Sequence, residues 1–124
     1  MAKITRYCIK DTEKLGENVF VVCRPSIFGN PYTHIKDKTT KARVVVKDRE
    51  TAIQLYDAYF DAMVKEDKDF KAEWDKMYEV YQNNDEIFLG CFCSLNESCH
   101  ADIIARKLKE RSVRDMLHNL RRNK

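Results

Sequence analysis

The feature that most constrains the fold is a short apolar strand that runs through a cysteine-rich turn into a helix, over residues 86–108. The apolar run 87–89 is too short for a helix and is followed by Gly90, which predicts a buried strand that ends there. Beyond the turn, apolar residues recur at helical spacing as far as Leu108, and Ser98 stands in a capping position. In open α/β sheets, ligands bind at the carboxyl ends of strands, so this turn predicts a binding site.

Length and composition are those of one globular domain. The 124 residues are 35% charged and 44% hydrophobic, which excludes a disordered chain, and no apolar run approaches the ~20 residues of a membrane helix. The first residues lack the apolar core of a secretory signal. Five cysteines, an odd number, argue against a disulfide framework and for a reducing compartment. We therefore expect a cytoplasmic protein with no membrane contact.

The remaining strand signals lie in the first third of the chain. Alternating residues predict a half-exposed strand at 3–9, and the β-branched run 19–23 predicts a central strand. Both prolines fall within residues 24–32, which predicts a fixed loop directly after that strand. The polar segment 34–41 predicts a surface excursion. Residues 43–46 fit either a short edge strand or an extended lead into the next helix.

Two amphipathic helices are expected next. Asp48 can cap a helix over about 49–65, and a second is predicted over 69–82. An aromatic stripe on the second helix could be a base-stacking platform, but this spacing is more typical of a core face. The stripe consists of Phe70, Trp74, Met77 and Tyr81. After residue 108 the helix either continues or restarts with Ser112 as its cap. This order of elements favours an α/β domain of two or three layers.

Charge is unevenly distributed along the chain. Residues 57–86 hold ten acidic and four basic side chains, whereas residues 106–124 hold eight basic and two acidic ones, including Arg106 and Lys124. Such a basic segment can contact nucleic acid or an acidic partner, but it also suits a solvated helix that complements its own dipole. We expect residues 1–108 to form the domain and residues 109–124 a basic helical extension.

The chemistry of the turn centres on Cys99 and His100. A helix N-terminus offers unpaired N–H groups that bind phosphate, and it lowers the pKa of a thiol placed there, so Cys99 is a candidate thiolate. His100 could act as acid, base or anion ligand, and Asp102 could pair with it or accept from exposed N–H groups. If the strand order places residues 24–32 beside this turn, Arg24 would bind phosphate and Asn30 a base or ribose edge.

Other residues of the same two motifs complete the predicted ligand-binding set. They are Pro25, Ser26, Gly29, Tyr32, Cys91 and Cys93. Plain packing is the alternative, since buried cysteine behaves as a small hydrophobe and a turn by itself can account for Gly29. A zinc site formed by Cys91, Cys93, Cys99 and His100 is a further alternative, although the spacing is unlike that of zinc knuckles. No other cofactor is expected.

Three ordered motifs resemble a known family. Residues 24–32 resemble its Arg-Pro-Ser…Gly-Asn-Pro-aromatic signature, and residues 48–56 are similar to its Arg-Glu-x-Ala-Ile-x-Leu-Tyr helix. Residues 89–93 and 99–104 look like its closing Leu-x-Cys-aromatic-Cys…Cys-His-Gly-Asp-Val-Leu motif. The family is the domain of unknown function 4326 (DUF4326), found in bacteria, phages and large DNA viruses. The resemblance covers roughly residues 17–108.

The sequence departs from the family pattern at a few positions. Phe92 stands where Trp is usual, Ala101 where Gly is usual, and no proline follows Cys93. The resemblance implies a small Rossmann-like α/β domain, with a sheet of three to five strands flanked by helices. The organisms in which the family occurs imply a viral accessory protein, in the host cytoplasm or a virus factory. The family name brings no established reaction.

The function that these observations predict is binding of a nucleotide-like, phosphate-bearing small molecule. Turnover is left open: the site could be a binder only, or a hydrolase or transferase that uses Cys99 or His100. The alternative is a nucleic-acid- or protein-interaction factor that acts through the basic segment 106–124. The sequence does not predict an oligomeric state.

Overall fold

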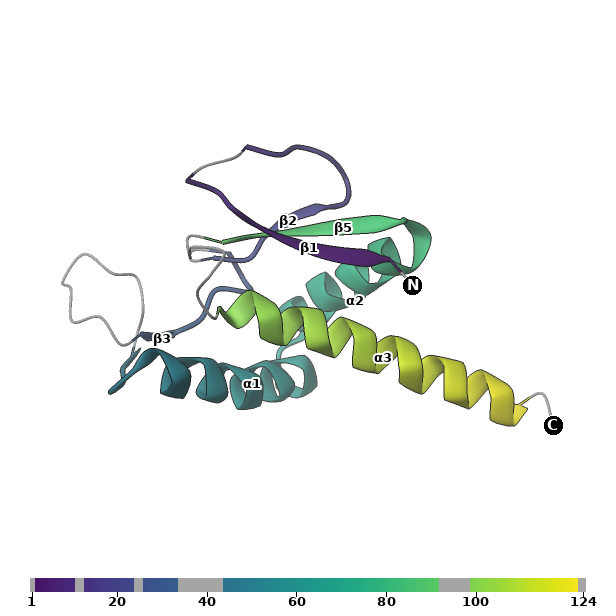
Figure 1. Cartoon of the computed structure of the whole chain (residues 1–124). Helices are drawn as coiled ribbons and strands as arrows, with labels where there is room; N and C mark the ends of the chain where they lie inside the picture. Colours follow the sequence, from purple (N-terminus) through teal and green to yellow (C-terminus); the bar gives the residue numbers. More distant parts are fainter. Residues whose placement is uncertain (1, 11–12, 24–25, 34–43, 92–98, 123–124) are drawn as a thin grey trace.

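The central element of the structure is strand β5. In the computed structural model, β1 (Lys3–Cys8), β2 (Val19–Val21) and β5 (Glu86–Cys91) form a parallel sheet in the order β1-β5-β2 (Figure 1). Because β5 lies between β1 and β2, the prediction that residues 19–23 form the central strand is wrong. The structure describes residues 2–10, 13–23, 26–33, 44–91 and 99–122.

Burial explains the strand order. In β5, Ile87, Leu89 and Cys91 are wholly buried, as a strand flanked on both sides requires. Strand β2 is only three residues long, and its Val21 is 47% exposed, which suits an edge. Both sequences are short apolar runs, so the run alone could not distinguish the two positions.

The sequence predicts that the strand ends at Gly90, and this prediction is wrong. The strand continues to Cys91, and the Tyr7 side chain of β1 lies against Gly90. A Cβ at Gly90 would stand 2.6 Å from Cζ of Tyr7 and 2.9 Å from Cγ2 of Ile9. Glycine is required here because it allows close approach of a neighbouring side chain, and not because it breaks the chain direction.

The two predicted helices are confirmed, and so is the predicted Asp48 cap of the first. Helix α1 (Arg49–Glu66) begins where the Asp48 side chain accepts a hydrogen bond from the N–H of Thr51 at 2.7 Å. Helix α2 (Lys68–Asn83) begins in the same way at Asp67, whose side chain accepts from two N–H groups of the first turn. One residue separates the helices, which accounts for their contact with each other.

The aromatic stripe of α2 is a core face, as predicted. Phe70, Trp74, Met77 and Tyr81 are each at most 5% exposed. Phe60 of α1 lies edge-on to both Phe70 and Trp74, with ring centroids 5.0 and 4.8 Å apart. Such edge-to-face pairs are favourable beyond simple burial, so these rings hold α1 against α2.

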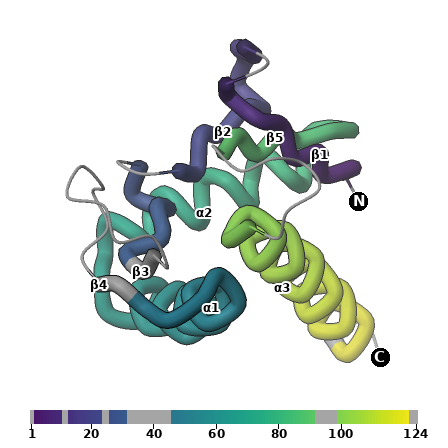
Figure 2. Tube along the Cα trace, turned by 60° about the vertical axis from the view of Figure 1, so that its left-hand side comes forward, coloured from purple at the N-terminus to yellow at the C-terminus, as the bar shows by residue number. Residues whose placement is uncertain are grey.

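Helix α3 (His100–Arg122) is continuous over 23 residues. The alternative of a second helix capped by Ser112 is therefore wrong, and the expected boundary between residues 108 and 109 falls inside one helix. Ile104 and Leu108 are fully buried against the sheet and the other helices. In both views the far half of α3 extends past the rest of the molecule (Figures 1 and 2).

The elements form two main layers. All three helices lie on one side of the parallel sheet, and the segment that joins β1 to β2 passes over the other side (Figure 1). There, Nζ of Lys14 lies 4.6 Å from the centre of the Phe88 ring. The predicted class, a small Rossmann-like α/β domain with a sheet of three to five strands flanked by helices, is confirmed.

A second, smaller sheet pairs β3 (Tyr32–Thr33) with β4 (Val44–Val45) in parallel near α1 (Figure 2). The short strand predicted at 43–46 is thus present. The predicted surface excursion at 34–41 lies outside the described residues. None of the described helices is both long and apolar enough to cross a membrane.

Candidate functional site

The two motifs singled out from the sequence meet at the carboxyl edge of the parallel sheet. Strands β2 and β5 are neighbours, and the N–H of Val22 donates to the Gly90 carbonyl at 2.8 Å where both strands end. The loop after β2 and the start of α3 therefore leave the sheet side by side. Nε2 of His100 lies 2.6 Å from the Val22 carbonyl oxygen, which ties the two motifs together.

This contact fixes the tautomer of the neutral His100 ring. A carbonyl oxygen only accepts, so Nε2 must carry a proton and donate it to Val22. In the neutral ring, Nδ1 is then the acceptor, and it lies 3.6 Å from Sγ of Cys99. The thiol and the imidazole thus form a pair in which one backbone carbonyl sets the tautomer.

The pair can hold its proton on either partner. With the proton on sulfur, the thiol donates to Nδ1; with the proton on Nδ1, the imidazolium donates to Val22 and to the thiolate. The N–H of Ala101 lies 3.5 Å from the same sulfur and donates to it. Because a backbone N–H favours negative charge on sulfur, this arrangement can generate a nucleophilic thiolate.

Cys99 is also the cap of α3. The N–H of Asp102 donates to the Cys99 carbonyl at 3.0 Å, and the Asp102 side chain accepts from the Cys99 N–H at 3.1 Å. The Asp102 side chain thus makes the contact that the third helical residue makes in a capping box, while the Cys99 sulfur accepts from the Ala101 N–H, where a serine or threonine hydroxyl would usually act as the cap. The helix therefore begins one residue later than a Ser98 cap predicts, and Ser98 itself lies outside the described residues.

The cap changes the predicted role of the helix N-terminus. The N–H groups of Ala101 and Asp102 donate to Cys99, so they are not available to an anion in this conformation. Acceptance of a hydrogen bond from the Cys99 N–H is one of the two roles that the sequence predicted for Asp102. Its carboxylate also pairs with Arg6 of β1 at 3.3 Å, and it is 57% exposed.

Both residues of the Cys99–His100 pair are buried, and so is the neighbouring Cys91. Cys99 is 1% exposed and His100 is 9% exposed. Cys91, at the end of β5, is wholly buried among core residues. Cys93 lies outside the described residues.

The loop after β2 is held by its own turn and by α1. The Ser26 hydroxyl accepts from the Phe28 N–H at 3.2 Å, and its carbonyl accepts from Gly29 at 2.8 Å. Asn30 is 7% exposed and donates from Nδ2 to the Ala52 carbonyl at 3.1 Å. In this conformation Asn30 thus anchors the loop to α1. Of the other predicted residues here, Arg24 and Pro25 are not described, and Tyr32 lies in β3.

Tyr56 of α1 is a member of the site that was not among the residues predicted from the sequence. Its hydroxyl donates to the Phe28 carbonyl at 2.7 Å, and its ring lies edge-on to His100 with centroids 5.0 Å apart. Burial raises the pKa of Tyr56 well above its ordinary value, and nearby Tyr59 and Cys99 raise it further. The sequence feature that points to Tyr56 is its position as the last residue of the 48–56 motif.

The alternative zinc set is only partly described. Among the residues that the structure places, no group of three or more histidine, cysteine or acidic side chains could hold a metal ion. Within the proposed set, Nε2 of His100 is occupied by the Val22 carbonyl. The remaining ligand, Cys93, is outside the description, and the zinc alternative stays a prediction.

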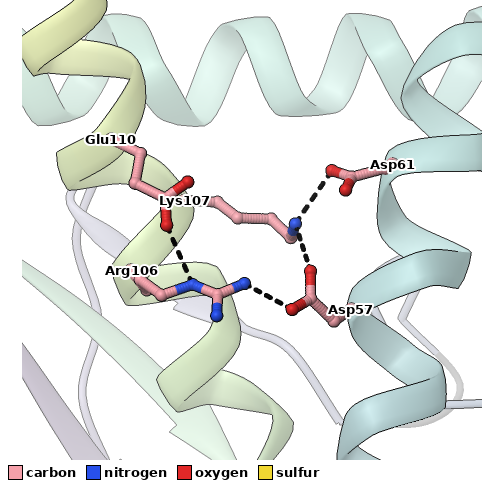
Figure 3. A network of polar contacts seen from close by, with 5 residues as sticks. All are labelled: Asp57, Asp61, Arg106, Lys107 and Glu110. Atoms are coloured by element: carbon pink, nitrogen blue, oxygen red, sulfur yellow. Dashed lines mark hydrogen bonds and ion pairs between the residues drawn. The ribbon is translucent and has the colours of Figure 1, made fainter.

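Part of the basic segment is engaged within the molecule. Arg106 and Lys107 of α3 pair with Asp57 of α1, and Lys107 also reaches Asp61 at 2.8 Å (Figure 3). The guanidinium of Arg111 lies 2.9 Å from a carboxylate oxygen of Asp75 in α2. These contacts neutralise three of the eight basic side chains, and contact with nucleic acid through residues 106–124 stays a prediction.

The comparisons with known proteins give one finding. No curated protein and no solved structure matches the chain. The family model described as "Domain of unknown function (DUF4326)" matches residues 7–110, which include Val22, Tyr56, Cys99 and His100. Since this match covers more than half of the 124 residues, the chain belongs to the DUF4326 family.

Proposed function

We propose that this protein binds a nucleotide-like, phosphate-bearing small molecule at the carboxyl edge of its parallel sheet and acts on it as a hydrolase or transferase. The observation that carries the proposal is the Cys99–His100 pair, whose sulfur and Nδ1 are 3.6 Å apart and whose tautomer is set by Val22. A purely structural cysteine would not need a histidine of fixed tautomer beside it.

The location supports a small-molecule ligand. Ligands of parallel α/β sheets bind outside the carboxyl ends of the strands, and here β1, β2 and β5 all end on the side where α3 begins. Arg6 lies close to this helix start, and its guanidinium can bind phosphate if the Asp102 carboxylate is displaced. Arg24, three positions after the last residue of β2, is the second proposed phosphate ligand.

The proposed reaction uses only this pair. His100 takes the thiol proton at Nδ1, and the Cys99 thiolate attacks the electrophilic atom of the substrate. As the bond to sulfur forms, the bond to the leaving group breaks, and that group departs with the proton from Nδ1. Water, in a hydrolase, or an acceptor hydroxyl, in a transferase, then gives its proton to Nδ1 and displaces the thiolate.

Burial sets a condition on this reaction. Because Cys99 is 1% exposed, ligand binding must open a path to its sulfur.

The first experiment is native mass spectrometry of the protein purified without added metal, beside a denatured control. A retained mass in the nucleotide range that is lost on denaturation would support the proposal and name the ligand class. Isothermal titration with AMP, ADP-ribose and inorganic phosphate follows, with turnover assayed by chromatography. A protein that carries no such mass and binds none of these three probes would contradict it.

Variants then separate binding from turnover. Cys99→Ala is expected to keep ligand affinity within about threefold and to lose turnover by roughly a thousandfold, because it removes the nucleophile, with its contacts to His100 and the Ala101 N–H, but none of the proposed phosphate ligands. The matched control is Cys8→Ala, which truncates another buried thiol at the end of a strand and should leave turnover unchanged. Equal turnover in Cys99→Ala and the unmodified protein would rule out the nucleophile assignment and leave a binding protein.

A further inference from the structure

The far half of α3 extends past the body of the protein and carries exposed apolar side chains (Figure 1). Residues 113–121 are all exposed. Four large apolar residues among them are between 45% and 58% exposed: Val113, Met116, Leu117 and Leu120. These positions fall within about 100° around the helix and form one apolar stripe. A contiguous apolar patch that is rimmed by polar residues is typical of an interaction surface.

Cations border this apolar stripe on one side only. Arg114 and Arg121 lie roughly 100° from the centre of the stripe on one side, and the matching positions on the other side are the uncharged Ser112 and Asn119. Neither arginine forms an ion pair with the residues that the structure describes. The acidic residue nearest to them, Glu110, already forms an ion pair within α3 at 3.0 Å. The exposed surface is therefore apolar with one positive border.

The near half of α3 shows which chemistry such a surface binds. Its apolar side chains Ile104 and Leu108 are fully buried in the core to which α1 and α2 contribute. Its cations Arg106 and Lys107 pair with carboxylates of α1 (Figure 3), and Arg111 pairs with a carboxylate of α2. Two amphipathic helices with acidic side chains thus cover the near half. The far half carries the same combination of apolar and basic side chains, but on exposed positions.

We propose that the far half of α3 binds an acidic amphipathic helix of a partner protein. The apolar face of the partner helix covers the apolar stripe, and its carboxylates pair with Arg114 and Arg121. Because four half-exposed side chains form a small interface, the dissociation constant is on the order of 10 µM. The surface lies at the opposite end of α3 from Cys99 and His100, so the inference does not depend on the proposed function.

The one-sided charge favours a partner helix over other anionic partners. A helix that lies on an anionic bilayer meets headgroups along both sides of its apolar face, whereas the side of Ser112 and Asn119 is uncharged. Nucleic acid would neutralise Arg114 and Arg121 through its phosphates but would leave the apolar stripe exposed. An acidic amphipathic helix is complementary to both parts of the surface.

Fluorescence anisotropy with synthetic peptides tests the proposal on the full chain. The probe is a labelled designed helix with leucine along one face and glutamate beside it. One control peptide scrambles this sequence, which keeps the charge and removes the apolar face, and the other replaces each glutamate with lysine. The acidic helix should bind about tenfold more tightly than either control, a difference of roughly 1.4 kcal/mol. Equal affinity for the three peptides would overturn the proposal.

Single variants test the surface. Leu117→Glu places a charge in the apolar stripe, and Arg114→Glu reverses the charge of its border, so each should weaken binding of the acidic helix by about tenfold. The matched controls are Leu15→Glu and Lys76→Glu, which make the same changes at exposed positions outside α3. Both controls should bind within about twofold of the unmodified protein, since exposed charges distant from an interface contribute little. Circular dichroism melts check that all four variants remain folded.

A charge swap separates direct ion pairing from a loss of helix structure. The double variant Arg114→Glu/Arg121→Glu should prefer the lysine peptide to the glutamate peptide, because the positive border has become negative. A double variant that binds neither peptide, although it remains folded, would contradict the ion pairs.

Three results, each in the absence of binding to the acidic helix, would assign the surface to a different occupant and overturn the proposal. Vesicles of phosphatidylcholine and phosphatidylserine that bind the unmodified protein but not Leu117→Glu would make it a membrane surface. A DNA duplex that binds Leu117→Glu but not Arg114→Glu would make it a nucleic-acid surface. A dimer in sedimentation velocity that Leu117→Glu abolishes would make the occupant a second copy.

Discussion

The ring of Tyr56 stands edge-on to the imidazole of His100, with the two centroids 5.0 Å apart. Through this contact, helix α1 supports the residue that begins α3. The hydroxyl of the same tyrosine donates to the Phe28 carbonyl in the loop after β2. One buried side chain therefore joins the three sequence motifs of the family, which lie at 24–32, 48–56 and 89–104.

Removal of the Tyr56 hydroxyl is expected to weaken this junction. Tyr56→Phe leaves the buried Phe28 carbonyl without its 2.7 Å donor and should lower the free energy of unfolding by about 1–2 kcal/mol. Tyr81→Phe is the matched control, since the Tyr81 hydroxyl is buried with no hydrogen-bond partner among the described residues. That change should be neutral or stabilising. Urea denaturation measures both, and equal losses would show that the Phe28 contact contributes nothing.

Gly90 is expected to reject even one methyl group. In Gly90→Ala, the new Cβ would stand 2.6 Å from the Tyr7 ring, and we expect a loss of about 1–3 kcal/mol in the free energy of unfolding. Truncation of the ring in Tyr7→Ala removes the main obstacle. The cost of Gly90→Ala should therefore be smaller in the Tyr7→Ala background. An additive double-mutant cycle would refute this steric explanation.

The ion-pair network between α1 and α3 should make stability depend on acidic pH (Figure 3). Hydrogen bonds from Lys107 and then Arg106 hold the pKa of Asp57 below its ordinary value. A lowered folded-state pKa contributes stability that is present above the unfolded value of about 3.9 and is lost as the pH falls through the folded value.

Asp57→Asn removes that contribution. Because the Lys107 side chain is only 9% exposed, we expect a loss of about 1–3 kcal/mol at pH 7. The difference from the unmodified protein should hold from pH 6 to about pH 4 and should shrink as the pH falls further towards the folded-state pKa of Asp57. Asp61→Asn is the control: Asp61 is 70% exposed, and its loss should cost under about 1 kcal/mol. Thermal melts across this pH range measure both, and a difference independent of pH would exclude the carboxylate as its source.

Asp102 has two separable contacts at the start of α3. Its carboxylate accepts from the Cys99 N–H and pairs with Arg6. Asp102→Ala removes both contacts and should cost about 1 kcal/mol of unfolding free energy, as loss of a helix cap does. Asp102→Asn keeps an oxygen for the cap, and Arg6→Gln removes only the ion pair, so both should cost less. If Arg6→Gln alone matched Asp102→Ala, the cap would be irrelevant to stability.

Much of the fold could be predicted from local pattern. Asp48 before an amphipathic run, the i, i+4, i+7 spacing of Phe70, Trp74 and Met77, and the short apolar run before Gly90 each specify an element by rules that act over a few residues. The turn between β5 and α3 was likewise found from the sequence, because cysteines and a histidine between a strand and a helix are unusual in composition.

What the sequence could not specify depends on contacts between distant residues. Which apolar run forms the central strand depends on which strands pair, so the sequences of β2 and β5 could not show which of them is central. Gly90 was interpreted as a strand end because Tyr7, 83 positions away, supplies the reason for a glycine. Likewise, Cys99 took the cap in place of Ser98, and Asn30 turned inward to Ala52.

The sequence by itself thus determined the elements, the family and the two motifs that form the site. Only the tertiary structure decided that Val22 sets the tautomer of His100 and that the Tyr56 ring packs against this histidine. It also decided that the apolar side chains in the far half of α3 are exposed. The physical reason is that helix and strand propensities act over a few neighbouring residues. A hydrogen bond such as that from His100 to Val22 joins residues 78 positions apart and forms only when the strands have paired.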